Sequence, residues 1–152
     1  VWRWLGYGLF AANLLAVARL VVRRAPRAIE WAFALLFLGL PLAIETSWPH
    51  YFVYLPFAQT LVALETEFLL RNSVSTSSRL VVWVAATLLL VSIILASMPF
   101  FQLVGRWQDY SQYGVLFVAN LSLLIATHAL TLRPAAQSGR PASAAAPAGA
   151  VR

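Results

Sequence analysis

Two carboxylates lie close together in the stretch LVALETEFLLR, which is otherwise mostly apolar. They belong to Glu65 and Glu67, and because two residues rotate a helix by about 200°, the side chains leave a helix on different faces. A carboxylate beside an imidazole can relay protons or hold a cation, and His128 occupies a similar position near the end of another apolar stretch. The chemistry that these residues favour is therefore proton or cation handling.

Two more charged residues, Arg19 and Glu30, lie about one helical turn inside the ends of their own apolar stretches. Ionisable groups within an apolar segment are costly, and they usually face protein or a partner of opposite charge. We therefore predict one polar layer, contributed by four helices, that can act as an ion site. Its members are Glu65, Glu67, His128, Arg19 and Glu30.

A structural interpretation of the same charges is also open. Glu67 and Arg71 are spaced i,i+4, and Arg27 and Glu30 are spaced i,i+3, so each pair can form along one side of a helix. Long side chains near helix ends also extend towards the polar boundary of a bilayer. On this interpretation the charges anchor helix ends, and Glu65 is the one residue that has to find a partner on another helix.

The sequence offers little else for a cofactor or for catalysis. It has no cysteine, which excludes zinc thiolates and iron–sulfur clusters. Its two histidines, His50 and His128, are expected on opposite sides of a bilayer, so His128 alone is a candidate ligand for a haem or a chlorophyll. No serine-hydrolase, zinc-protease or phosphate-loop motif occurs. We therefore predict no enzyme, no metal and no resident cofactor.

The elements that carry these residues are long apolar segments. The chain is 61% hydrophobic and 11% charged, whereas a soluble domain carries about 25% charged residues. The predicted fold class is all-α, a polytopic integral membrane protein with one five-helix transmembrane domain at residues 1–133. A disordered tail rich in alanine and proline is expected at 134–152. The five helices are expected at residues 2–22, 28–44, 51–70, 80–100 and 114–132.

Three prolines lie within or near these segments. A proline inside a helix removes a hydrogen bond and bends the helix. We expect kinks at Pro41 and Pro56, and we expect Pro99 to end the fourth helix.

Arginine is concentrated in alternate connections, and lysine is absent, which is typical of a GC-rich coding sequence. Cytoplasmic connections are enriched in positive residues, so we place the N-terminus outside and the tail inside, in the cytoplasmic membrane of a bacterium. The arginines flank apolar segments and form no single basic face, so the net charge of +6 does not indicate nucleic acid binding. The arginines of the connections that we place inside, which we call the inner connections, are Arg23, Arg24, Arg27, Arg71 and Arg79.

Milder polar residues lie nearer the middle of the segments. Amides and hydroxyls at this depth usually hydrogen-bond between helices. The residues expected to do so are Asn13, Gln59, Ser92 and Asn120. Small residues four apart permit close packing, and Gly8, Ala12 and Ala16 form such a ridge on the first helix.

These features favour a protein that works through helix contacts. We predict a small non-catalytic membrane protein, an accessory or scaffolding subunit of a larger assembly, with respiratory and photosynthetic assemblies as candidates, or a homo-oligomer. Its partners would be membrane lipids and other membrane subunits or further copies of itself. Two alternatives stay open: a transporter or channel that uses the polar layer, and a sensor that binds a lipid or small hydrophobic molecule between the second and third helices.

Overall fold

The computed structural model describes residues 2–25, 27–43, 53–72, 76–104 and 114–132. In these ranges the chain has six helices and no strand, which confirms the all-α prediction. His50 and the tail expected at 134–152 lie outside the described residues. The helices are α1 (Trp2–Val22), α2 (Ala28–Ala43), α3 (Leu55–Asn72), α4 (Thr76–Leu95), α5 (Met98–Val104) and α7 (Val115–Thr131).

The five long helices follow the expected segments, but several are shorter. α3 begins at Leu55 rather than at residue 51, and α2 and α7 have 16 and 17 residues, or about 24 and 26 Å. Over the residues that the structure describes, no helix combines the length and the apolarity that a membrane crossing needs. The helices themselves therefore do not support the expectation of five bilayer-spanning segments.

The fourth expected segment divides into two helices. α4 ends at Leu95, and the hydroxyl of Ser97 then accepts a hydrogen bond from the backbone N–H of Phe100 at 3.3 Å. Pro99 lies in the first turn of α5, where a backbone N–H has no helical acceptor to lose. The expectation that Pro99 ends a helix running from 80 to 100 is wrong, because a serine N-cap starts a new helix before it.

The other two prolines differ in their position along a helix. Pro41 lies inside α2, where it removes one helical hydrogen bond, and the kink there stays a prediction. Pro56 is the second residue of α3, so its missing N–H interrupts nothing. The kink expected at Pro56 is therefore not required.

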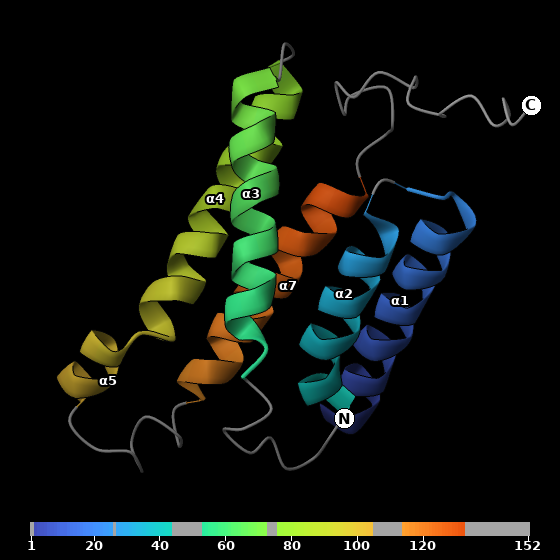
Figure 1. Ribbon diagram of the computed structural model, residues 1–152. Helices are drawn as coiled ribbons and strands as arrows, with labels where there is room; N and C mark the ends of the chain where they lie inside the picture. The colour runs from blue at the N-terminus through green and yellow to red at the C-terminus, as the bar shows by residue number, and fades with distance from the viewer. Residues whose placement is uncertain (1, 26, 44–52, 73–75, 105–113, 133–152) are drawn as a thin grey trace, which may run out of the picture.

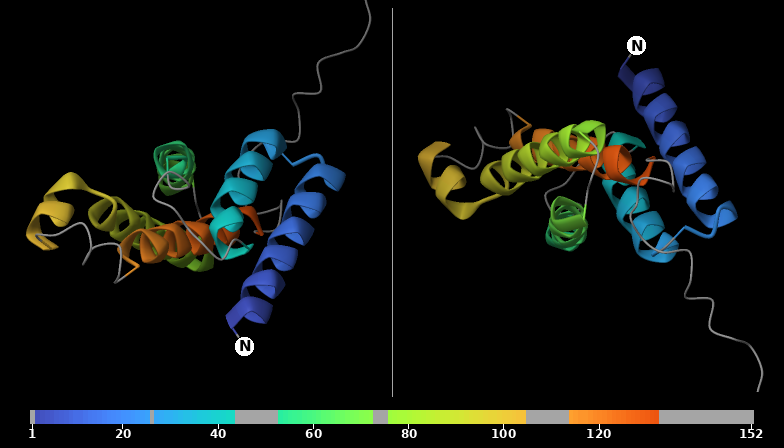
Figure 2. Two further views of the ribbon diagram at one scale, coloured as in Figure 1. Left: turned by 90° about the horizontal axis from the view of Figure 1, so that it is seen from below. Right: turned by 90° about the horizontal axis from the view of Figure 1, so that it is seen from above.

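The helices form a bundle with α7 at its centre. It packs along α4 and also contacts α2 and α3, while α3 covers one side of α4. Figure 1 shows α3 in front of the α4 and α7 pair, and Figure 2 shows α1 at the edge of the bundle. Because α1 contacts the rest mainly through α2, most of its surface has no neighbouring helix among the described residues.

The core is mainly aliphatic, with Trp31 as a buried aromatic residue, and draws on every long helix. One residue from each is Leu20, Leu35, Val62, Val82 and Leu123, and the last four have no exposed surface. Side chains of this size let neighbouring helices approach closely. Close approach in turn brings polar side chains within reach of the backbone of the next helix.

α1 ends in a hydrogen-bonded turn at residues 23–25. Arg24 has a φ of 48°, its N–H bonds to the carbonyl of Val21, and the N–H of Ala25 bonds to the carbonyl of Leu20. These two bonds make a Schellman motif, in which glycine is the usual residue at the left-handed position. Arg27, with a φ of 57°, precedes α2, so two arginines occupy left-handed backbone in one short connection.

Candidate functional site

α2 receives a side-chain amide from each of two neighbouring helices. Nδ2 of Asn13 in α1 donates to the backbone carbonyl of Leu35, and Nδ2 of Asn120 in α7 donates to the carbonyl of Leu38 at 2.8 Å. Asn13 has no exposed surface and Asn120 is 2% exposed. The two acceptors are about one helical turn apart. Both asparagines therefore bond between helices, and the main chain of α2 accepts a hydrogen bond from α1 and another from α7.

Glycine permits the close approach of α1 to α2. At Gly39 an added Cβ would overlap Nδ2 of Asn13, and at Gly6 it would overlap the carbonyl oxygen of Leu42. The two helices therefore meet at two heights where a larger residue does not fit. Oδ1 of Asn13 is buried and accepts no hydrogen bond from the described residues, so its amide is only partly satisfied.

The small-residue ridge expected on α1 lies mostly on the wrong face. Gly8 and Ala12 are exposed, and an added Cβ at Gly8 would meet no atom within 4 Å. Of the ridge, Ala16 alone is buried, on the face that also carries Gly6 and Asn13. The prediction failed for Gly8 and Ala12 because a four-residue spacing defines a stripe on a helix but not which stripe meets a neighbour.

α3 and α4 share a further polar contact. Nε2 of Gln59 donates to Oγ of Ser92 at 3.1 Å, and Ser92 has no exposed surface. Ser122 and Thr127 of α7 are also buried, but their hydroxyls donate to carbonyls of their own helix at 2.9 and 2.8 Å. The amides thus reach across to other elements, whereas these hydroxyls find the carbonyl one turn earlier first.

The five residues of the predicted ion site come from α1, α2, α3 and α7 and lie towards one end of the bundle. α1, α3 and α7 finish at this end, and α2 and α4 begin there, as Figure 1 shows. The arginines of the inner connections are found at the same end. We name it the arginine end, and its arginines are Arg19, Arg23, Arg24, Arg27, Arg71 and Arg79.

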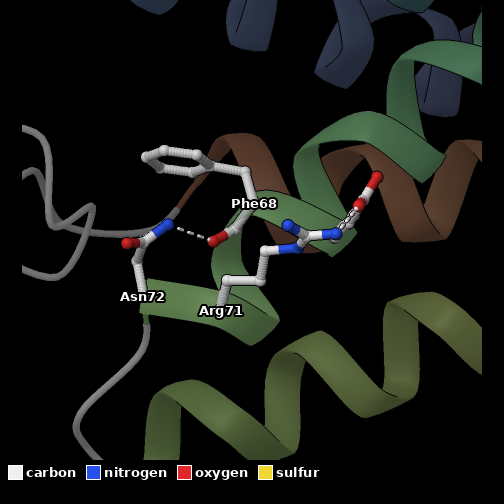
Figure 3. Close-up of polar contacts among 4 residues, drawn as sticks. Phe68, Arg71 and Asn72 are labelled. Carbon is white, nitrogen blue, oxygen red and sulfur yellow. Dashed lines mark hydrogen bonds and ion pairs between the residues drawn. The ribbon is translucent and has the colours of Figure 1, made fainter.

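Two carboxylates of this layer form ion pairs with arginines that are three or four residues away in the sequence. Oε1 of Glu67 accepts a hydrogen bond from Arg71 at 2.5 Å, with side chains 57% and 75% exposed, and Figure 3 shows Arg71 extended along α3 towards that carboxylate. Oε1 of Glu30 lies 3.7 Å from Nε of Arg27. Exposed pairs of this kind stabilise a protein by about 0–1 kcal/mol. These contacts have the geometry that the structural interpretation requires.

The remaining members of the layer differ in burial. Glu65 and His128 are half-buried, and Arg19 is exposed. Within the described ranges, no group of three or more histidine, aspartate and glutamate side chains is placed to hold a metal ion. A proton or cation site at Glu65 and His128 stays a prediction, as does a haem or chlorophyll held by His128.

An aromatic cluster that was not expected from the sequence joins α2 to the start of α3. The ring centroid of Phe33 lies 4.3 Å from that of Phe37 and 5.4 Å from that of Phe57. The ring centroids of Phe37 and Tyr54 are 3.9 Å apart. Phe33, Tyr54 and Phe57 are 42%, 39% and 43% exposed. The signal was present in the i,i+4 spacing of Phe33 and Phe37, which puts both rings on one face of a helix.

Comparison with known proteins gives no relative: no family model, curated protein or solved structure matches this chain. The features that bear on function are therefore those of the arrangement itself. In the described residues, that arrangement consists of amides that join helices, an exposed aromatic cluster and a charged end.

Proposed function

We propose that the chain is an integral membrane protein that works through helix contacts, as an accessory or scaffolding subunit of a larger assembly or as a homo-oligomer. One observation carries the proposal: the bundle buries amides and exposes large apolar side chains. Water disfavours this arrangement, because exposed apolar surface is unfavourable there. Lipid favours it, because the hydrocarbon region offers polar groups no hydrogen-bond partner and apolar side chains suit it.

The exposed apolar residues are distributed over every long helix. Soluble monomers rarely expose a contiguous apolar patch larger than a few hundred Å². Here the exposed surface includes helix middles as well as helix ends. One example from each long helix is Leu15 at 72%, Ile29 at 83%, Leu64 at 50%, Trp83 at 61% and Ile125 at 49%.

The surface, rather than the helix length, supports a membrane setting. Within the described ranges the helices do not have the length and apolarity of a crossing, so the multi-pass arrangement rests on the surface alone. α1 starts and α7 finishes at opposite ends of the bundle, as Figure 1 shows. Because arginines gather on the cytoplasmic side of membranes, we assign the arginine end to the cytoplasm and the start of α1 to the outside.

α1 is the helix best suited to contact a partner. It packs mainly on α2, and its outer face carries Leu15 and Val22, which are spaced i,i+7 and are 72% and 81% exposed. An apolar helix face in a bilayer can be covered by lipid or by another helix. A partner helix on this face would add contacts without any change in the bundle.

The membrane setting can be tested with single spin labels, because the chain contains no cysteine. The labelled variants are Leu15→Cys, Trp83→Cys and Ile125→Cys, with Arg71→Cys as the control, each reconstituted in phosphatidylcholine vesicles. We expect collisions with oxygen to exceed collisions with a polar nickel complex at the three apolar positions and the reverse at Arg71. Equal access of the nickel complex to Leu15, Ile125 and Arg71 would show that these faces are in water and would end the proposal.

The role through contacts needs a separate measurement. The full chain would be extracted in mild detergent from its native membrane, and the mass of the complex would be determined. We expect either stable co-purifying subunits or a multiple of the 16.7 kDa chain. A chain that is monomeric and alone would contradict an accessory or oligomeric role while leaving the membrane setting intact.

A second function is favoured by the aromatic cluster: binding of a small hydrophobic molecule between α2 and α3. Three of its four residues are exposed and Phe37 is half-buried, and aromatic side chains commonly line sites for apolar ligands. The purified chain would be extracted with organic solvent and the extract analysed by mass spectrometry. The Phe57→Ala variant should lose a bound compound that the exposed control Phe117→Ala retains. An extract that contains only bulk lipid in both variants would exclude this function.

A further inference from the structure

We propose that the turn between α1 and α2 binds the phosphate of an anionic phospholipid. The residues that would hold it are Arg19, Arg23 and Arg24, which we name the turn arginines. The inference rests on the membrane setting proposed above, and it adds a specific lipid class and a specific place. Three observations support it: the backbone of the turn, the charges on it and the apolar residues beside them.

Arginine occupies backbone positions of the turn at which glycine is favoured. Arg24 occupies the left-handed position of the Schellman motif with a φ of 48°, and Arg27 has a φ of 57°. A side chain other than glycine is disfavoured in this conformation, because its Cβ approaches the following carbonyl oxygen. Non-glycine residues in such conformations are concentrated at binding and catalytic sites. Two arginines in one connection are therefore best explained by a use for their charge.

Among the residues that the structure describes, the turn arginines have no acidic partner. Arg19 and Arg23 are exposed, and their i,i+4 spacing places two like charges on one side of α1, which is unfavourable without an anion. In the part of the chain that the structure describes, Arg27 pairs with Glu30 and Arg71 pairs with Glu67, and no ion pair of a turn arginine is found there. The carbonyl end of α1 favours nearby cations, but it does not require arginine at the left-handed position.

The apolar residues beside the turn select a lipid over a soluble anion. Val21 and Val22, which directly precede Arg23, are 56% and 81% exposed, and Ile29, which follows the turn, is 83% exposed. A free phosphate or a polyanion would leave these side chains in water. A phospholipid covers them with its acyl chains while its phosphate lies at the level of the arginines, which is the position where long cationic side chains meet a membrane surface.

The test compares two lipids on the full chain. The protein would be purified in a neutral detergent, mixed with equal amounts of phosphatidylglycerol and phosphatidylcholine, and examined by native mass spectrometry. We expect the unmodified chain to retain phosphatidylglycerol about tenfold more than phosphatidylcholine, and we expect the double variant Arg23→Gln and Arg24→Gln to retain both about equally. The matched control, Arg71→Gln and Arg79→Gln, removes the same charge from the same end and should keep the preference.

Arg24→Gly separates binding from a structural role. It relieves the left-handed backbone and removes one turn arginine, so we expect a more stable chain that retains less phosphatidylglycerol. An unchanged lipid preference in this variant and in the Arg23 and Arg24 double variant would overturn the inference. An equal loss of the lipid preference in the control double variant would show that net charge, and not the turn, causes the preference, which would also overturn the inference. Displacement of the lipid by inorganic phosphate at constant ionic strength would show that the turn binds free phosphate instead. Failure of the unmodified chain to associate with pure phosphatidylcholine vesicles would instead contradict the membrane setting.

Discussion

The middle of the bundle and its arginine end use polar residues in opposite ways. In the middle, Asn13 and Asn120 are buried and bond to the backbone of another helix, at sequence separations of 22 and 82 residues. At the arginine end, Glu67 and Arg71 are exposed and bond within one turn of the same helix, at a separation of 4 residues. The charged residues therefore connect positions within one helix, whereas the uncharged amides connect different helices.

The difference follows from solvation. A buried amide that loses its partner costs about 1–3 kcal/mol, so its bond decides which helices lie together. An exposed carboxylate or guanidinium is solvated by water or headgroups whether or not it is paired, so its ion pair decides little. The comparison predicts large effects for changes in the middle and small effects at the arginine end.

The largest effect is expected where α1 and α2 touch through their backbones. The Gly6→Ala variant places a Cβ against the carbonyl oxygen of Leu42, and a backbone carbonyl cannot rotate away as a side chain can. Overpacking of this kind costs about 1–3 kcal/mol, and we expect about 2 kcal/mol less free energy of unfolding. The measurement is a titration of the folded chain in mild detergent with sodium dodecyl sulfate.

Gly8→Ala is the matched control for this prediction. Gly8 lies two residues away on the same helix, is exposed, and leaves an added Cβ with no atom within 4 Å. Alanine favours a helix over glycine by about 1 kcal/mol, so this variant should be as stable as the unmodified chain or more stable. Equal destabilisation by the two substitutions would show that α1 does not pack on α2 through Gly6.

The next effect concerns the bond between α7 and α2. Asn120→Leu removes the 2.8 Å hydrogen bond to the carbonyl of Leu38 and places a larger side chain in a buried site. We expect a loss of about 1–2 kcal/mol in the free energy of unfolding, measured by the same titration.

Asn72→Leu tests whether location or chemistry matters. The amide of Asn72 donates to the carbonyl of Phe68 in its own helix at 2.7 Å, as Figure 3 shows, and the residue is exposed. Its replacement should change the free energy of unfolding by less than about 0.5 kcal/mol. Similar losses for the Asn72 and Asn120 variants would contradict the distinction between the middle of the bundle and its end.

A gain in stability is expected at the arginine end from Arg24→Gly. Glycine adopts the left-handed backbone of the Schellman motif without the crowding that a Cβ creates there. We expect the free energy of unfolding to rise by about 0.5–1 kcal/mol, because the relief of strain exceeds the added freedom of the unfolded chain. A loss of stability would show that the arginine side chain holds the turn together.

The sequence was sufficient to predict helices and their approximate limits. Long apolar runs define five helical segments, and the structure has a long helix in each. The break at Ser97 was missed because serine followed by Met-Pro-Phe resembles a helix end until its hydroxyl is seen to cap a new helix. Apolar composition also indicated a bilayer, whereas the limits of the described helices depend on caps and prolines that composition does not report.

The site was harder to predict because the sequence indicates how far along a helix a residue lies but not which neighbouring helix its side chain faces. Asn13 and Asn120 were expected to bond between helices, but nothing in their spacing indicates that both would reach α2. Gly6 was overlooked in favour of Gly8, since Gly6 is followed four residues later by Phe10 rather than by a small residue, and spacing does not indicate which face meets α2. The local pair of Glu67 and Arg71, by contrast, follows directly from its i,i+4 spacing.

The smallest effect is expected for that local pair, and it is the sharpest test of the comparison. A double-mutant cycle with Glu67→Gln and Arg71→Gln should give a coupling of about 0.3 kcal/mol that falls further when salt is added, because both side chains are mostly exposed. A coupling above about 1 kcal/mol that persists in high salt would mean that the pair is shielded from water, by lipid or by a partner that covers α3. In that case the arginine end would resemble the middle of the bundle, and the weak role assigned to its charges would be wrong.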